Sequence, residues 1–270
     1  MPPSDLDLSS HVAFAARLAD AARAETLARF RAGTEVHNKA GIWFDPVTEA
    51  DREAERVMRR MIAAIYPDHG IIGEEFGVHR AEAEWRWVMD PVDGTRAFVC
   101  GVASWATLIA LEKGGAPVLG LIDQPYTDER WIGHSGGAEF HRGGRRRPCR
   151  TSGVKDLKAA RITTTDPRRT AYFTADEAEA FSVLCEASRL ARFSLDAYGY
   201  GLLALGEIDL VVEASLKRHD FSALAPIVEG AGGVITDWRG EPLGSQDRGR
   251  VIAAASAELH AAALETLSRV

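Results

Sequence analysis

Two carboxylates stand three positions apart where an apolar segment ends. Asp90 and Asp93 follow the run 85–89, and Pro91 between them cannot continue regular strand pairing through its own nitrogen. The proline kink allows both side chains to point at one place instead of alternating across a sheet. Clustered carboxylates are hard oxygen ligands that suit Mg²⁺. This segment therefore predicts a metal site.

A second acidic pair, Glu74 and Glu75, follows another short apolar run, 70–73. If both runs are strands that end at the same edge of a sheet, the two acidic pairs lie near one another, because open α/β sheets place their sites outside strand ends. A third acid, Asp220, stands at the start of a predicted helix, whose N-terminus favours phosphate. Each acid alone has a plainer explanation as a helix cap or a solvated turn residue. Their combination favours phosphate chemistry at a divalent cation.

Two further segments begin helices with polar groups in place. Gly94 and Thr95 open a helix directly after the acids, and their backbone N–H groups offer an anion-binding arrangement. Thr48 is a favourable N-cap, and an acid, Asp51, follows it three positions later. The sequence thus predicts one helix start that suits phosphate and one that is well capped.

The pattern of apolar residues predicts a mixed fold. Amphipathic stripes predict helices over residues 10–31 and 47–67, and hairpin signals predict strands over 107–122 and 129–141. A polar and basic stretch at 143–148 is expected to be a loop. The first part of the chain is therefore rich in antiparallel strands.

Beyond that stretch, short strands alternate with helices. We expect an α+β fold with a layered α-β-α-β-α arrangement, an antiparallel-rich N-terminal half and an α/β C-terminal half. The N-terminal subdomain, residues 1–145, holds most of the predicted metal ligands. The C-terminal subdomain, residues 146–270, holds the last ligand and the substrate-contacting residues.

Composition argues against several classes of partner. The chain of 270 residues is 46% hydrophobic and 26% charged, and its net charge of −7 argues against nucleic acid or an anionic membrane as partner. Its 3 cysteines are far apart and form no CxxC pair, which argues against a disulfide framework or a zinc site. No secretory leader and no apolar run of membrane-spanning length is visible. A cytoplasmic protein is expected.

Three motifs closely resemble, in order and spacing, the inositol monophosphatase-like superfamily of Mg²⁺-dependent phosphatases. They are Gly-Glu-Glu at 73–75, Asp-Pro-Val-Asp-Gly-Thr at 90–95, and Asp220 followed by Gly-Ala-Gly-Gly at 230–233. The resemblance covers nearly the whole chain. It implies that a metal-activated water attacks the phosphate ester directly, without a cysteine, serine or histidine nucleophile. It also implies a homodimer.

The resemblance assigns roles to individual residues and implies about two to three bound Mg²⁺ ions. The implied metal ligands are Glu74, Asp90, the backbone carbonyl of Val92, Asp93 and Asp220. The implied catalytic residues are Glu74, Asp51 and Thr95, of which the last two orient the water. The implied phosphate-binding residues are Gly94 and Thr95. Lys39 falls in the segment that resembles the family's loop over the metals, and Glu75 is an adjunct rather than a core ligand.

Three segments resemble the histidinol-phosphatase branch of that superfamily, namely residues 194–201, 213–217 and 223–230. Histidinol phosphate carries an ammonium and an imidazole, so acids near its leaving group would favour it. The implied substrate-binding residues are Asp93, Asp196, Glu213 and Asp220. Asp196 and Glu213 could instead accept hydrogen bonds from inositol hydroxyls, so both substrates stay open.

The main expectation is a Mg²⁺-dependent phosphomonoesterase that converts L-histidinol phosphate to L-histidinol. The first alternative is an inositol-1-monophosphatase. Phosphatases of sugar bisphosphates or of 3′-phosphoadenosine nucleotides are further alternatives, and they would need extra basic groups. A non-catalytic interaction protein is disfavoured, because a buried cluster of unneutralised carboxylates is costly without metal. The chain departs from the superfamily at Arg218 and His219, where an aromatic residue commonly precedes the last metal-binding Asp.

Overall fold

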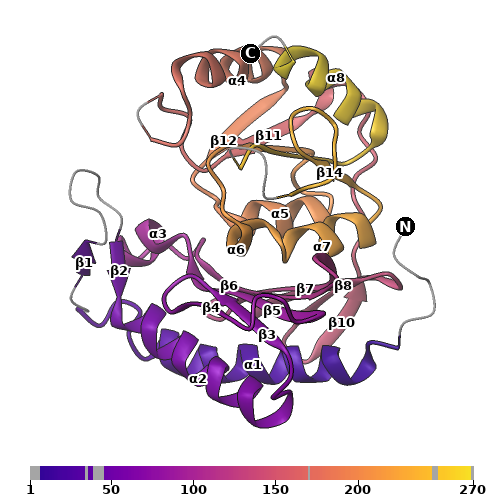
Figure 1. The fold of residues 1–270 in the computed structure, drawn as a ribbon. Helices are drawn as coiled ribbons and strands as arrows, with labels where there is room; N and C mark the ends of the chain where they lie inside the picture. Colours follow the sequence, from indigo (N-terminus) through magenta and orange to yellow (C-terminus); the bar gives the residue numbers. More distant parts are fainter. Residues whose placement is uncertain (1–6, 34–35, 39–45, 170, 245–248, 269–270) are drawn as a thin grey trace.

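The structure, a computed structural model, consists of stacked layers of helix, sheet, helix, sheet and helix (Figure 1). It describes residues 7–33, 36–38, 46–169, 171–244 and 249–268. The layers confirm the predicted α+β fold class.

Among the described residues, the larger sheet has eight strands in the order β10-β9-β8-β7-β6-β5-β3-β4. They are β3 (Gly70–Gly73), β4 (Gly77–His79), β5 (Trp85–Asp93), β6 (Ala106–Lys113), β7 (Ala116–Gln124), β8 (Glu129–His134), β9 (Gly137–Arg142) and β10 (Arg145–Pro148). β3 pairs with β5 in parallel, and the other neighbouring strands pair antiparallel. The parallel pair places the ends of β3 and β5 at the same edge of the sheet.

Two helices, α1 (Ser9–Leu27) and α2 (Glu49–Ile65), cover one face of this sheet (Figure 1). Leu18 of α1 and Met58 of α2 are fully buried in one apolar cluster with Trp87 of β5. α1 ends before the predicted limit at residue 31, and turns follow it. A hairpin of β1 (Val36–Asn38) and β2 (Pro46–Thr48) leads into α2.

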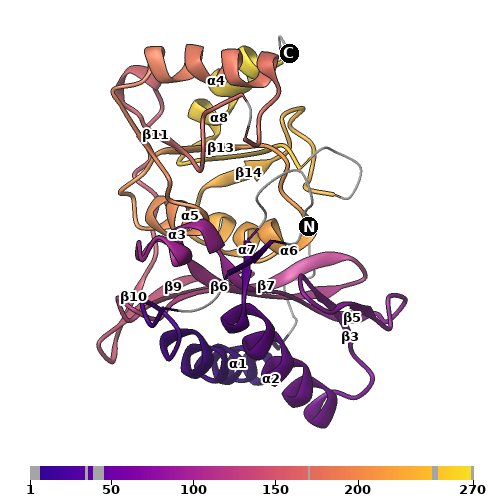
Figure 2. The same ribbon diagram turned by 90° about the vertical axis from the view of Figure 1, so that its left-hand side faces the viewer.

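The middle layer consists of α5 (Ala197–Ala204), α6 (Arg218–Phe221) and α7 (Leu224–Gly230), which lie between the two sheets (Figure 2). Among the described residues, the second sheet has five strands in the order β12-β11-β13-β15-β14. They are β11 (Arg161–Thr164), β12 (Leu190–Phe193), β13 (Leu210–Glu213), β14 (Val234–Thr236) and β15 (Val251–Ala254). The outer layer and the short helical segments are α4 (Ala175–Ala187), α8 (Ala257–Leu267), α3 (Thr95–Val99) and the 3₁₀ turn Leu157–Ala159.

The second sheet is mixed in direction. β12, β11 and β13 are parallel neighbours, whereas β15 runs antiparallel to both β13 and β14. α4 and α8 pack on each other and cover the outer face of this sheet (Figure 1). The parallel strands with their helices agree with the predicted α/β character of the C-terminal half.

Strand glycines bring the middle layer close to the larger sheet. A Cβ at Gly120 of β7 would lie 1.9 Å from the carbonyl oxygen of Ala223, and one at Gly133 of β8 would lie 2.4 Å from that of Pro226. A larger residue at either position would push α7 away from the sheet. Because α6 directly precedes α7, these glycines also help to place Asp220.

The predicted loop over residues 143–148 is wrong. Arg145–Pro148 forms β10, which pairs antiparallel with β9 as the edge strand of the larger sheet. Its side chains are exposed, and charged residues are a common way to protect a sheet edge from pairing with other chains. The sheet therefore extends beyond the predicted boundary between residues 145 and 146, and the division into two subdomains stays a prediction.

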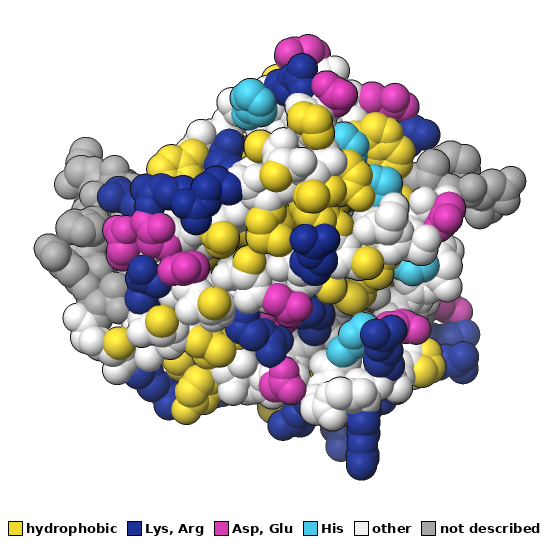
Figure 3. All heavy atoms as spheres, turned by 90° about the horizontal axis from the view of Figure 1, so that it is seen from below, with side chains coloured by type: hydrophobic (Ala, Val, Ile, Leu, Met, Phe, Trp, Pro, Cys, Tyr) yellow, Lys and Arg dark blue, Asp and Glu magenta, His cyan; other side chains and the backbone are white. Residues whose placement is uncertain are grey.

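The outer face beneath α1 and α2 carries charges of both signs. Lys and Arg side chains lie beside Asp and Glu side chains there, with hydrophobic side chains between them (Figure 3). No helix in the described part of the chain is both long and apolar enough to cross a membrane.

Candidate active site

The acidic residues of the sequence meet at one edge of the larger sheet. In the parallel pair of β3 and β5, Gly73 lies opposite Met89, so Glu74 and Asp90 follow at the same level. This pairing confirms that the two apolar runs are strands with a common edge. β5 includes both acids and ends at Asp93, as predicted, and its register with β6 is irregular between Asp90 and Asp93. The proline kink is a bulge within the strand.

Two groups of carboxylates lie at this edge. In each group, one carboxylate oxygen per residue lies within 4.8 Å of the others. The first acidic group is Asp90, Asp93 and Asp220, and the second acidic group is Asp51, Glu74 and Glu75. Glu74 and Asp90 lie close enough to link the two groups, since the charge of Glu74 raises the pKa of Asp90. Asp220 comes from α6, so the middle layer completes a cluster that otherwise belongs to the larger sheet and α2.

Burial and mutual repulsion raise the pKa values of the first acidic group. Burial raises the pKa of Asp90 well above its usual value, and the charges of Glu74 and Asp93 raise it further. The pKa of Asp93 is raised by burial and then by Asp196 and Asp220, and the pKa of Asp220 is raised mainly by burial. Such a cluster keeps its negative charges most easily beside a cation, and its oxygen donors suit Mg²⁺. The residues present therefore fit a divalent metal.

The two carboxylate oxygens of Asp51 differ. Oδ2 accepts hydrogen bonds from the Thr48 backbone N–H at 2.8 Å and from the Thr48 hydroxyl at 2.6 Å, which completes the predicted cap of α2. Oδ1 is buried and has no hydrogen-bond partner among the described residues. Burial raises the pKa of Asp51 to about 7, against the hydrogen bonds from Thr48. Oδ1 is thus an acceptor that is held in place next to Glu74 and Glu75.

The bulge of β5 and the start of α3 form one continuous polar segment. The Val92 N–H donates to Asp90 Oδ1 at 3.0 Å, and the Thr95 hydroxyl donates to the Val92 carbonyl at 3.1 Å. Gly94, the N-cap of α3, has a φ of 77°, which suits glycine. This segment carries the predicted carbonyl ligand, the predicted phosphate-binding residues and the hydroxyl expected to orient water.

Glu55 of α2 supports the second acidic group, and the sequence analysis missed it. Its fully buried carboxylate accepts hydrogen bonds from the backbone N–H of Glu75 at 2.7 Å and of Phe76 at 3.1 Å. A Cβ at Gly73 would lie 2.0 Å from Glu55 Oε1, so the glycine makes room for this contact. The available signal was an acid one helical turn after Asp51, on the apolar face of an amphipathic helix.

Asp196 and Glu213 lie on the C-terminal side of the same cluster. Asp93 Oδ2 accepts a hydrogen bond from the Ala197 N–H at 2.7 Å, which joins β5 to the start of α5. Burial raises the pKa of Asp196 to about 6. Glu213 accepts hydrogen bonds from the Thr165 N–H at 2.7 Å and hydroxyl at 2.9 Å, and burial nevertheless raises its pKa to about 8. The structure thus brings Asp93, Asp196 and Glu213 together.

Tyr172 and Arg96 lie beside these acids, and the sequence analysis did not single them out. The Arg96 guanidinium lies 5.1 Å from the centre of the Tyr172 ring. Burial raises the pKa of Tyr172 to about 12, and the charges of Asp196 and Asp93 contribute to this shift. No local pattern in the sequence marks either residue, because they meet only in the folded chain.

Three residues with open roles have different outcomes. Lys39 lies outside the described residues. His219 Nε2 lies 3.3 Å from Asp220 Oδ1, so this histidine contacts a predicted metal ligand. Arg218 donates to Glu112 and does not pair with the acids of β5.

The comparisons with known proteins agree with this fold and site. The family model described as "Inositol monophosphatase family" matches residues 7–270. The chain is 38% identical to the bifunctional phosphatase IMPL2 of Arabidopsis thaliana over 98% of this chain and 77% of that protein. It is 33% identical to the histidinol-phosphatase of Mycobacterium tuberculosis over 86% of this chain and 89% of that one. A solved inositol monophosphatase from Zymomonas mobilis is 41% identical, with a TM-score of 0.86 over 97% of this chain and 99% of that one.

The layered fold and the clustered carboxylates define a metal-dependent phosphatase of small phosphorylated substrates. The chain belongs to the inositol monophosphatase family.

Proposed function

We propose that this protein is a Mg²⁺-dependent phosphomonoesterase that hydrolyses L-histidinol phosphate to L-histidinol. The observation that carries the proposal is the meeting of the two acidic groups with the buried acids of the C-terminal half. Relatives named histidinol-phosphatase, from Chlorobaculum parvum and Mycobacterium tuberculosis, support the choice of substrate.

We assign about two to three Mg²⁺ ions to the acidic groups. The proposed ligands are Glu74, Asp90, the Val92 carbonyl, Asp93 and Asp220. When bound, the metal supplies a water of lowered pKa and positive charge for the phosphoryl oxygens and the leaving group. The first and second acidic groups supply the negative charge that holds it.

The attacking water is positioned by Asp51 and Thr95 in this proposal. The Thr95 hydroxyl donates its hydrogen bond to the Val92 carbonyl, so the oxygen lone pairs of Thr95 remain to accept a hydrogen bond from water. Asp51 Oδ1 offers a second acceptor, because Thr48 holds only the other oxygen. These two acceptors bind the two hydrogens of the water, so the lone pairs of its oxygen point away from them. The backbone N–H groups of Gly94 and Thr95 then hold phosphoryl oxygens.

The leaving group would face Asp196 and Glu213. A buried carboxylate with a raised pKa gains stability from a nearby cation, and the ammonium of histidinol supplies one. A neutral polyol gains only hydrogen bonds from the same acids. The acidic surroundings therefore favour a cationic leaving group.

Hydrolysis of inositol 1-phosphate is the second candidate. It is favoured by the 41% identity to a solved enzyme named inositol monophosphatase, and by carboxylates that can accept hydrogen bonds from hydroxyl groups. A homodimer and a cytoplasmic location stay predictions of the sequence.

Phosphate release from a panel of substrates tests the proposal. The panel is histidinol phosphate, inositol 1-phosphate, fructose 1,6-bisphosphate and 3′-phosphoadenosine 5′-phosphate, each with Mg²⁺ and with EDTA as control. We expect kcat/KM for histidinol phosphate to exceed the others by about a hundredfold, which corresponds to about 2.7 kcal/mol of transition-state discrimination. Equal rates on inositol 1-phosphate would contradict the proposed substrate. No metal-dependent release from any member would contradict the phosphatase itself.

A further inference from the structure

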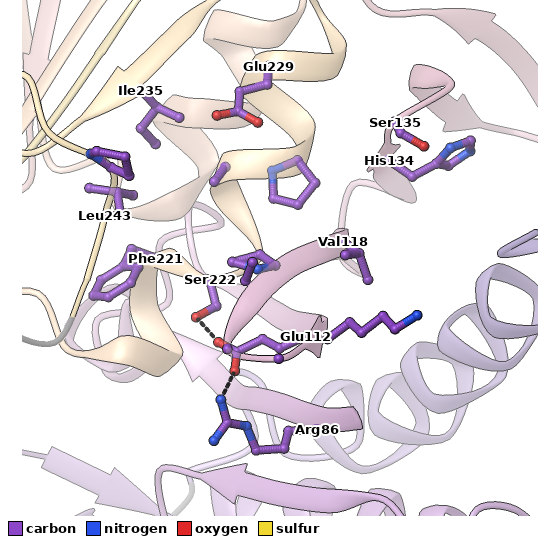
Figure 4. Close-up of a pocket in the computed structure, with 18 of the residues that line it drawn as sticks. Arg86, Glu112, Val118, His134, Ser135, Phe221, Ser222, Glu229, Ile235 and Leu243 are labelled. Carbon is purple, nitrogen blue, oxygen red and sulfur yellow. Dashed lines mark hydrogen bonds and ion pairs between the residues drawn. The ribbon is translucent and has the colours of Figure 1, made fainter. Parts of the chain in front are cut away.

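A buried ion-pair network ties the helix of Asp220 to the larger sheet. Glu112 of β6, whose side chain is 1% exposed, accepts hydrogen bonds from Arg218 Nε at 2.8 Å and Nη2 at 2.7 Å. The Ser222 hydroxyl lies 3.2 Å from the same carboxylate, and Arg86 Nη2 lies 3.3 Å from it (Figure 4). One carboxylate on β6 thus holds the residues on both sides of Asp220.

α6 cannot hold Asp220 in place by itself. The helix has 4 residues, and a single helical turn is not stable in isolation. Asp220 Oδ2 accepts a hydrogen bond from the Lys217 N–H at 2.6 Å, but this bond lies within the same turn. The position of Asp220 relative to β5 therefore depends on the contacts that anchor α6 to the larger sheet.

The network is connected to the strand that carries the other two acids. β6 is the direct neighbour of β5, with Glu112 opposite Arg86 and Leu108 opposite Asp90. The carboxylate that receives Arg218 and the acids Asp90 and Asp93 hence belong to one pair of hydrogen-bonded strands. A shift of the anchor would move Asp220 relative to those acids.

We propose that Arg218 and Glu112 are positioning residues that set the geometry of the first acidic group and thereby its affinity for a divalent metal. The inference rests on the proposed function insofar as the first acidic group binds metal.

A second arginine offers a matched control. Arg161 donates Nε and Nη2 to the fully buried carboxylate of Asp209 at 2.8 and 3.0 Å, and Nη2 also reaches the Gly206 carbonyl at 2.6 Å. Arg218 has the same set of bonds, with the Gly115 carbonyl at 3.0 Å as its third acceptor. The Arg161 pair, however, lies within the C-terminal half and anchors no residue of the acidic groups.

The experiment compares Mn²⁺ binding by Arg218→Lys and Arg161→Lys in the absence of substrate. The electron paramagnetic resonance signal of free Mn²⁺ measures how much of the ion stays unbound. Lysine keeps the charge but loses the two-pronged hydrogen bond. We expect Arg218→Lys to weaken binding of one ion about tenfold, as loss of a partner behind a metal ligand commonly does. Arg161→Lys should lower the urea midpoint by roughly the same amount as Arg218→Lys. Its Mn²⁺ affinity should nevertheless change by less than about twofold. Equal affinities in the two variants would overturn the inference.

Glu112→Gln provides a second route if Arg218→Lys does not fold. It should weaken Mn²⁺ binding to a similar extent. If both single variants fold, the variant that combines Arg218→Lys and Glu112→Gln should bind Mn²⁺ little more weakly than either single variant, because both changes break one interaction. Additive losses would overturn the proposed pairing. If wild-type protein binds no Mn²⁺, both this inference and the proposed function are overturned. If the two lysine variants bind Mn²⁺ equally well, only this inference is overturned and the proposed function stands.

Discussion

The protein buries two kinds of carboxylate, and their surroundings differ. Asp209 and Asp123 are fully buried, and each accepts hydrogen bonds from arginine side chains. Asp90 and Asp93 lie in the first acidic group at the end of β5, and no Arg or Lys in the described ranges pairs with them. Both kinds have lost much of their contact with water, but among the described residues only the first kind has an arginine partner.

The pKa values follow this difference. Burial acts against the charged form of Asp209, but hydrogen bonds from Arg161 and Ser152 hold its pKa below the usual value. Burial also acts against the charged form of Asp93, and neighbouring acids add to the effect, so its pKa is raised well above the usual value. Arginine partners therefore keep acids such as Asp209 in the charged form, whereas the acids of the first acidic group need a cation beside them to keep their charge.

The largest effect is expected for Asp93→Asn. Loss of this charge should lower kcat with Mg²⁺ about a thousandfold or more, because several kcal/mol of metal-assisted stabilisation would be lost. The urea midpoint should stay equal or rise, since one repulsive charge is removed from the cluster. The expected loss of kcat and the expected urea midpoint are checked by measuring turnover and urea unfolding on the same preparation. An active Asp93→Asn variant would show that the first acidic group is not the metal site.

Asp209→Asn should show the opposite pattern. The change removes the buried charge partner of Arg161 and leaves it only the exposed Glu207 at 3.7 Å, so we expect the free energy of unfolding to fall by roughly 2–3 kcal/mol. Because the pair lies away from the acidic groups, kcat should stay within about twofold. Urea unfolding and phosphate release measure the two quantities. A loss of activity that exceeds the loss of folded protein would break the contrast between the two kinds of acid.

Glu213→Gln tests an acid that is hydrogen-bonded but has a raised pKa. Its pKa of about 8 in the folded protein lies above the usual 4.5, so the folded state holds the proton longer than the unfolded state. Stability should therefore fall as pH rises from 4.5 through about 8, and the variant should lack this loss. At pH 8.5 we expect the variant to be more stable than wild type by on the order of 4–5 kcal/mol, about 1.4 kcal/mol for each pH unit between 4.5 and 8, with no advantage at pH 4.

The same variant tests the substrate. It should lower kcat/KM for histidinol phosphate about tenfold more than for inositol 1-phosphate, because only the first has a cationic leaving group (a factor of ten is about 1.4 kcal/mol). Urea unfolding over the pH series and the two kcat/KM values provide the measurements. A uniform loss on both substrates would argue against a charge-based role for Glu213.

The smallest effect concerns two half-buried bases. His11 and His69 stack with Trp85 at ring-centre distances of 5.2 and 5.9 Å, and burial lowers both pKa values below 6.5. The unfolded chain then binds protons first, so stability should fall as pH drops through 6.5. His11→Phe keeps a ring in the stack and removes one titration, which should flatten the dependence of the urea midpoint between pH 7 and pH 5. An unchanged slope would remove His11 as a cause.

The local features of this site could be predicted from the sequence. The strands before Glu74 and Asp90 and the cap of α2 at Thr48 follow from short apolar runs and from residue types that act on near neighbours. β10 could not be predicted from the pattern, because its arginines show no apolar alternation and its structure depends on pairing with β9.

The long-range contacts of the supporting residues could not be predicted from the sequence for a related reason. Glu55 acts on the backbone 20 residues later, and Arg218 bonds to Glu112 across 106 residues. No spacing rule connects such positions, since the contact exists only after the layers have packed. The acids that serve the site lie in compact motifs, whereas the residues that hold them in place are scattered through the chain.

Calorimetric titration of Mg²⁺ into wild type and Asp93→Asn at pH 6, in two buffers that differ in ionisation enthalpy, tests the central claim most directly. The account predicts saturable binding by wild type with net release of protons, because the metal must displace protons from carboxylates of raised pKa. Asp93→Asn should bind at least one ion more weakly and release fewer protons. Equal binding by both proteins, or binding without proton release, would contradict the claim that these acids are held for a cation.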